Sequence, residues 1–138
     1  TVINEAAILE LVELYPMNDL YILCVDRDCR GERLLALKNL EASINAVLEN
    51  QKFIAACGIQ ELEVWVLAGM TDLDPAWNEV RVHCHPKETY FDPHAEKRKV
   101  TETPGRGRKV LGEEAAKRYA ARVRTMCPEI QVCEVAAV

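Results

Sequence analysis

The apolar run over residues 20–25 is the feature that most constrains the fold of this chain. It reads LYILCV and contains no charged residue that would mark a solvent-exposed face. A strand that is buried on both faces of a parallel sheet has this appearance. The stretch 31–50 follows it, and its apolar residues recur at helical spacing. A buried strand followed by a long helix predicts a crossover unit, and therefore a parallel sheet.

The first half of the chain continues this alternation of helices and strands. The patterns predict helices over 4–15, 31–50 and 59–70, and strands over 20–25 and 53–57. The second half is less regular, and its predicted elements are a short helix within 71–80, a strand over 81–85, a helix beginning at Pro86, a helix over 113–126 and a strand or frayed tail over 130–136. The 138 residues suit a single α/β domain over 1–138.

Six cysteines are scattered along the chain without any CxxC pair. In a chain long enough to bury its own core, this distribution favours reduced thiols, and we expect Cys24 and Cys57 to fill the core. No apolar run reaches the roughly 18 residues that a membrane helix needs, and no signal peptide is visible. We therefore expect a cytoplasmic protein that does not enter the membrane.

Charge is unevenly distributed along the chain. The net charge is −5, but residues 97–124 contain ten Lys and Arg against three acids. Within this segment, residues 101–112 contain Pro104 and three glycines, which predicts a flexible basic loop. Such a segment can bind nucleic acid locally while the acidic remainder avoids it. The alternative is a solvated helix face beside a mobile loop.

Asp26 and Asp28 follow the predicted strand over 20–25 at its carboxyl end. If the strand continues through them, its period of two places both carboxylates on one side and Arg27 on the other. Two close carboxylates repel unless a cation lies between them, and Mg²⁺ or Mn²⁺ suits such oxygen ligands. The alternative is that these acids cap the next helix or pair with Arg27, Arg30 or Arg33.

The stretch ILCVDRDCRG, followed by a long helix, resembles the metal-binding motif of the Toprim domain, in which a hydrophobic strand ends in D-x-D. IQELEVWVLAG and HPKETYF, with a later basic helix, are similar to small bacterial Toprim-like proteins of unknown function. The matching features span roughly residues 20–126. The resemblance implies a three-layer, Rossmann-like fold with a mainly parallel sheet, bound Mg²⁺ or Mn²⁺, and a nuclease or toxin role beside an ATPase in phage defence.

The sequence departs from the Toprim pattern at its amino end. A complete Toprim site has a glutamate at the end of a first strand, whereas here only four residues precede Glu5 within the stretch TVINE. We expect that strand to lie upstream, so that the chain is a fragment of a longer one. Glu63 fits the family's acid-before-Trp position and would assist catalysis. Glu61 and Glu63 are two apart on the predicted helix, so both cannot face one site.

Four basic residues are candidates for contact with a phosphate. Lys87 follows Pro86 and would reach a scissile phosphate as a point charge. The PGRGRK loop would bind a phosphate backbone through Arg106, Arg108 and Lys109.

The sequence therefore predicts a metal-dependent, phosphodiester-cleaving α/β domain. A second interpretation is a catalytically silent effector domain that binds a protein partner such as an ATPase through its acidic face. A third is a doubly wound, nucleotide- or phosphate-responsive regulatory domain in which an acidic pocket also binds a metal.

Overall fold

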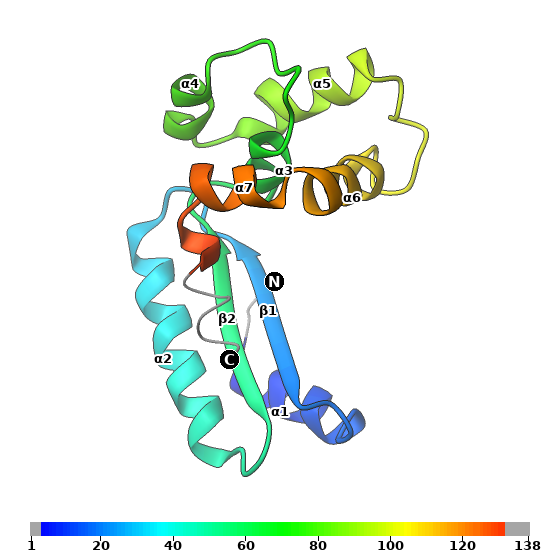
Figure 1. Cartoon of the computed structure of the whole chain (residues 1–138). Coiled ribbons are helices and arrows are strands. Elements are labelled where there is room, and N and C mark those ends of the chain that lie inside the picture. Colours follow the sequence, from blue (N-terminus) through cyan, green and yellow to red (C-terminus); the bar gives the residue numbers. More distant parts are fainter. Residues whose placement is uncertain (1–3, 132–138) are drawn as a thin grey trace.

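The computed structural model describes residues 4–131. A two-stranded parallel sheet pairs β1 (Leu20–Asp26) with β2 (Lys52–Gly58), and α2 (Gly31–Val47) connects the two strands (Figure 1). The other elements are α1 (Glu5–Leu14), α3 (Glu63–Ala68), α4 (Trp77–Val82), the π-helix η1 (Lys87–Phe91), α5 (Asp92–Lys97), α6 (Arg108–Arg118) and α7 (Ala120–Met126). The prediction of an α/β fold with a parallel sheet is confirmed.

The crossover unit has its core on one face of the sheet. Tyr21 and Phe53 face each other across the register and pack with Val12 of α1 and Ile44 of α2. Because α1 and α2 both pack on this face, the described residues show two layers at the sheet rather than the expected three. On the opposite face, Ile22 is 56% exposed, so the prediction that β1 is buried on both sides is wrong.

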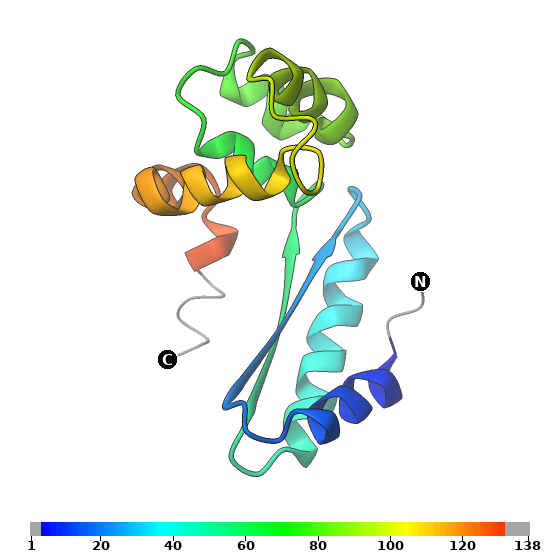
Figure 2. The same cartoon turned by 90° about the vertical axis from the view of Figure 1, so that its right-hand side faces the viewer.

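Helices α3 to α7 form a second body at the carboxyl ends of the strands (Figures 1 and 2). Its core is separate from that of the sheet and is centred on residues with little or no exposure: Val64, Leu67, Val80, Phe91, Ala95 and Leu111. The chain enters this body directly from β2. Helices α3 and α6 therefore cover any site at the carboxyl ends of the strands.

Three predicted elements in this body differ from the structure. The helix expected over 59–70 is confined to α3, because residues 59–62 form the turn that leaves β2. The strand expected over 81–85 is wrong, since α4 includes Arg81 and Val82. The helix expected over 113–126 begins earlier, at Arg108, and is interrupted at Tyr119. The predicted tail over 130–136 lies mostly outside the described residues.

The predicted loop over 101–112 is a series of turns only as far as Gly107. Gly107 has a φ of 96° and precedes the first residue of α6. A Cβ at Gly107 would lie 2.9 Å from Val100 Cγ2, so both the backbone angle and the packing favour glycine there. The loop is therefore shorter and more tightly packed than its composition suggests.

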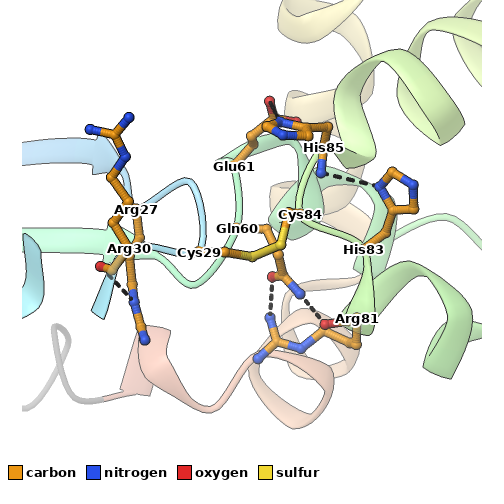
Figure 3. Close-up of a disulfide and its surroundings, with 9 residues drawn as sticks. All are labelled: Arg27, Cys29, Arg30, Gln60, Glu61, Arg81, His83, Cys84 and His85. Atoms are coloured by element: carbon orange, nitrogen blue, oxygen red, sulfur yellow. Dashed lines mark hydrogen bonds and ion pairs between the residues drawn. A yellow bond between two sulfur atoms is a disulfide. The ribbon is translucent and has the colours of Figure 1, made fainter. Parts of the chain in front are cut away.

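A disulfide joins Cys29, in the β1–α2 loop, to Cys84, which follows α4 (Figure 3). Their Cα atoms are 5.6 Å apart, which is an ordinary separation for bonded cysteines. The expectation of six reduced thiols is therefore wrong for this pair. Spacing along the chain gave no indication of it, because 55 residues separate the two cysteines and only the docking of the helical body brings them together.

The disulfide should contribute substantially to stability, because it closes a long loop and links the two bodies. We expect Cys29→Ala/Cys84→Ala to lower the free energy of unfolding by about 2–4 kcal/mol. Urea denaturation without reductant measures this difference. Cys24→Ala, which removes an exposed free thiol, is the control and should leave stability nearly unchanged.

Reductant should lower the stability of the wild-type chain to that of the double variant, and should not affect the variant. If the urea midpoint of the wild-type chain does not change when reductant is added, the disulfide does not form.

Candidate functional site

The candidate site lies where β1 ends beneath α3. Asp26 is the last residue of β1, and its Oδ1 accepts a hydrogen bond from the Leu62 amide at 2.7 Å. Burial raises the pKa of the Asp26 carboxyl, and the nearby negative charges of Glu63 and Asp28 raise it further. The carboxyl ends of parallel strands are the usual position of a ligand crevice in α/β folds. Asp26 therefore occupies the position that the sequence predicted for it.

Asp28 is not arranged as the strand alternation predicted. Strand β1 ends at Asp26, and the chain turns so that Asp28 and Cys29 have φ values of 50° and 57°. The Asp28 carboxylate pairs with Arg33 Nη1 at 2.8 Å, and the same Nη1 also donates to the Asp26 carbonyl. The period-two argument therefore fails at Asp28. The pairing with Arg33, which the sequence left as an alternative, is the one observed.

Glu61 and Glu63 have different environments because Glu61 precedes α3 rather than belonging to it. Glu61 is buried, and its Oε2 accepts from the Lys87 backbone amide at 2.7 Å. Its Oε1 lies 3.8 Å from His85 Nδ1, and both residues are drawn beside the disulfide in Figure 3. Burial raises the pKa of the Glu61 carboxyl, and the Lys87 amide partly offsets this effect. Glu61 therefore anchors the start of η1.

Glu63, at the start of α3, is 7% exposed, and its Oε1 accepts from Arg108 Nε at 2.5 Å. The Arg108 guanidinium also lies 5.8 Å above the Phe91 ring. A small cavity of about 190 Å³ is formed by Asp26, Leu62, Glu63, Val66 and Arg108. The structure thus brings together three predicted site residues: Asp26, Glu63 and Arg108, the last of which lies 45 residues beyond Glu63 in the sequence.

The remaining predicted residues lie outside this cavity. Lys87 begins η1, and its ammonium lies 3.6 Å from Glu88 Oε1. Arg106 and Lys109 are exposed on either side of Arg108. Arg108 is therefore the member of the predicted phosphate-binding loop whose side chain lines the cavity.

Two carboxylates, those of Asp26 and Glu63, line the cavity together with the Arg108 guanidinium. Among residues 4–131, no group of three or more His, Cys, Asp and Glu side chains is arranged to hold a metal ion. Mg²⁺, however, is commonly held by one or two carboxylates and completes its shell with water. Asp26 and Glu63 line one cavity and suit that mode, whereas Asp28 is engaged with Arg33.

Sequence reasoning missed two contacts that shape the site. The bond from the Leu62 amide to Asp26 spans 36 residues, and the pair of Glu63 with Arg108 spans 45. The excess of positive charge over residues 97–124 was the only signal that a basic side chain would meet the acidic strand ends. It did not indicate which one.

Comparison of the chain with protein-family models, curated proteins and solved structures finds no match. None of the helices within the described residues is both long and apolar enough to cross a membrane.

Replacement of Asp26 by asparagine should stabilise the folded chain at neutral pH. The asparagine side chain would keep an oxygen for the Leu62 amide but remove a half-buried charge beside Glu63. Because the pKa of Asp26 is raised on folding, its ionised form costs stability above that pKa, and the cost vanishes below the ordinary value of about 4. The gain in Asp26→Asn should therefore be full at pH 7 and shrink as the pH falls.

Urea denaturation at pH 7 and pH 4 measures this difference between the variant and the wild type. Glu49→Gln removes an exposed carboxylate and should change stability little at either pH. Loss of stability in Asp26→Asn at pH 7 would show that the charge of Asp26 is needed by the fold.

Proposed function

We propose that this chain is a Toprim-like, divalent-metal-dependent domain that acts on a phosphodiester. The observation that carries the proposal is the shared cavity of Asp26, Glu63 and Arg108 at the carboxyl end of β1. Asp26 and Glu63 would hold Mg²⁺ or Mn²⁺, and Asp28 would contribute charge from the neighbouring loop. A cation bound there would neutralise the developing charge on a phosphate and its leaving oxygen.

Arg108 fits a role in phosphate binding. It already supplies a positive charge against Glu63, at 2.5 Å, on the side of the cavity formed by α6. A phosphate oxygen is an alternative acceptor of the same geometry for a guanidinium group. Arg108 would therefore transfer a hydrogen bond from Glu63 to substrate when Glu63 engages a cation.

The proposal places a nucleic-acid backbone along the basic segment. Arg106 and Lys109 are exposed beside Arg108, at the turn where α6 begins. Contacts to phosphate there would position a strand without reading its sequence. Lys87 would approach from η1, which Glu61 fixes through the Lys87 amide. The association with an ATPase in phage defence stays a prediction from the resemblance.

The second candidate is a catalytically silent domain that binds a protein partner. The ion pairs of Asp28 with Arg33 and of Glu63 with Arg108 favour it, because each neutralises a carboxylate that a metal would otherwise engage. In that case the carboxylates of Asp28 and Glu63 would serve only the fold. Neither metal binding nor cleavage would depend on them.

Calorimetric titration with Mg²⁺ and Mn²⁺ separates the two candidates. We expect the wild-type chain to bind one cation, and Asp26→Asn and Glu63→Gln each to weaken binding at least about tenfold, because each removes one of two carboxylate ligands. Asp28→Asn should have a smaller effect, since Arg33 holds that carboxylate. Cleavage of DNA and RNA in Mn²⁺ should fall in the same order.

Glu49→Gln is the control for charge, because Glu49 is exposed and belongs to the α2–β2 connection. A wild-type chain that binds no cation would favour the silent domain. Unchanged affinity in both Asp26→Asn and Glu63→Gln would place any metal elsewhere.

Removal of the exposed basic side chains should weaken nucleic-acid binding without unfolding the site. We expect Arg106→Ala/Lys109→Ala to lower affinity for single-stranded DNA and to make it less dependent on salt, because about two phosphate contacts are lost. Fluorescence anisotropy at several salt concentrations measures both effects. Arg30→Ala, at an exposed position in the β1–α2 loop, is the matched control. Equal salt dependence in all three proteins would exclude this turn as the contact.

A further inference from the structure

Side chains of α2 cap the outer edge of β2 over only part of its length. The even-numbered residues of β2 bond to β1, so its odd-numbered residues direct their backbone groups outward. Asn45 binds the amide and the carbonyl of Phe53, and Glu41 Oε2 accepts from the Ala55 amide at 2.7 Å. The next outward amide is that of Cys57. Among the residues that the structure describes, it has no hydrogen-bond partner.

A cavity of about 290 Å³ lies along this uncapped part of the edge, between β2 and α2. Its lining is mainly apolar and includes Leu34 of α2 and Ile59, which follows β2. The volume lies near the lower end of the range for small-molecule sites, and about ten water molecules would occupy it in the liquid. The cavity is therefore of a size for a small organic ligand. It shares no described lining residue with the cavity of Asp26 and Glu63.

The two carboxylates that line this cavity already have partners. Glu41 accepts from the Ala55 amide. Glu129 pairs through both oxygens with Arg81, at 2.9 and 3.1 Å, and also accepts from Trp65 Nε1 at 3.2 Å. The charge of Glu129 is therefore balanced by Arg81, and the carboxylate of Glu41 is held by the backbone of β2.

The two cations that line the cavity are not paired in this way. Arg27 donates through Nε to the Arg30 carbonyl at 3.3 Å, and neither Arg27 nor Lys38 forms an ion pair with a carboxylate of residues 4–131. Burial raises the pKa of the Cys57 thiol, and the positive charges of Arg27 and Lys38 act against this effect, so both charges are felt inside the cavity. Two positive charges thus stand against the one remaining negative charge, that of Glu41.

We propose that this cavity binds a small organic anion that has an apolar body and a single oxyanion head, either carboxylate or phosphate. The head would accept hydrogen bonds from the Arg27 guanidinium and the Cys57 amide, and Lys38 would add positive charge. Hydrogen bonds between a guanidinium group and an oxyanion are among the strong ones in proteins. The body would lie against Leu34 and Ile59, where burial of apolar surface adds affinity. This inference goes beyond the proposed function and does not depend on it.

Four matched probes test the class of ligand by calorimetric titration of the full chain at constant ionic strength. We expect octanoate and octyl phosphate to bind with a Kd below about 1 mM, and octanamide and acetate to bind at least about tenfold more weakly, because the first lacks the charge and the second the body. The tighter of the two octyl anions identifies the head. Octanamide that binds as tightly as both anions overturns the proposal, as does a chain that binds neither anion.

Charge variants locate the head of the ligand. Arg27→Gln should weaken octanoate binding at least about tenfold and leave octanamide binding unchanged, because it removes the charge but keeps a hydrogen-bond donor. Lys38→Gln should have a smaller effect in the same direction. Arg30→Gln is the matched control, since Arg30 is exposed in the same loop and does not line the cavity. Octanoate affinity that is equal in all three variants and the wild type overturns the assignment.

A pair of leucines on α2 locates the body of the ligand. Leu34→Ser should weaken octanoate binding because Leu34 lines the cavity, whereas Leu35→Ser should not, because Leu35 is 64% exposed and lies outside the lining. Both side chains are exposed, so the fold should persist, and circular dichroism checks this for every variant. Equal effects of the two substitutions would place the body elsewhere and overturn the proposal.

The Cys57 thiol reports occupancy of the cavity independently of calorimetry. Cys57 lines the cavity, whereas Cys24 is an exposed free thiol outside its lining. Octanoate at about ten times its Kd should slow alkylation of Cys57 by iodoacetamide about tenfold, since about nine-tenths of the sites are then filled. Alkylation of Cys24 should not change. Peptide mass spectrometry measures both rates, and a Cys57 rate that octanoate does not change overturns the proposal.

Discussion

Within residues 4–131 the sheet has two strands, so it has two outer edges and two faces to satisfy, and the way this chain does so determines most of its structure. Helix α2 covers one face of the sheet and also caps the backbone of one edge. Ile44 packs against the sheet, while Asn45 and Glu41 bind the backbone of β2. Nothing comparable covers β1 in the described residues. The backbone of the sheet is therefore capped by side chains along the outer edge of β2, whereas the described residues cap the outer edge of β1 only at the Asp26 carbonyl.

The helical body is held to the sheet at the ends of the strands by contacts of different kinds. The Cys29–Cys84 disulfide is covalent, and the Leu62 amide binds the last carboxylate of β1. Asp26 thus has a structural role and a candidate functional one. Its bond to Leu62 lowers the pKa, but burial and the charge of Glu63 raise it more. A carboxyl group whose pKa is raised by burial and by a neighbouring carboxylate, and which lines a cavity, is a candidate functional residue.

The balance between the two proposed functions depends on arginines. Arg33 and Arg108 each neutralise an acidic side chain at the strand ends. Arg33 also binds a backbone carbonyl, so it is part of the β1–α2 turn. Arg108 has its second hydrogen bond within its own turn, to the Gly105 carbonyl, and its guanidinium lines the cavity. Arg108 is therefore the basic residue best placed to exchange a carboxylate for a phosphate.

The sequence by itself determined the local elements whose patterns are strong. The pattern over residues 4–15, the apolar run before Asp26 and the helical spacing after Gly31 predicted α1, β1 and α2 within a few residues, because short-range contacts and burial decide such elements. Only the tertiary structure decided the partners of the charged and sulfur-containing side chains. Glu63 meets Arg108, Asp28 turns to Arg33 and Cys29 bonds Cys84 because the helical body folds back over the strand ends. Contacts between residues far apart in the sequence produce no repeating pattern in it, so pattern analysis does not predict them.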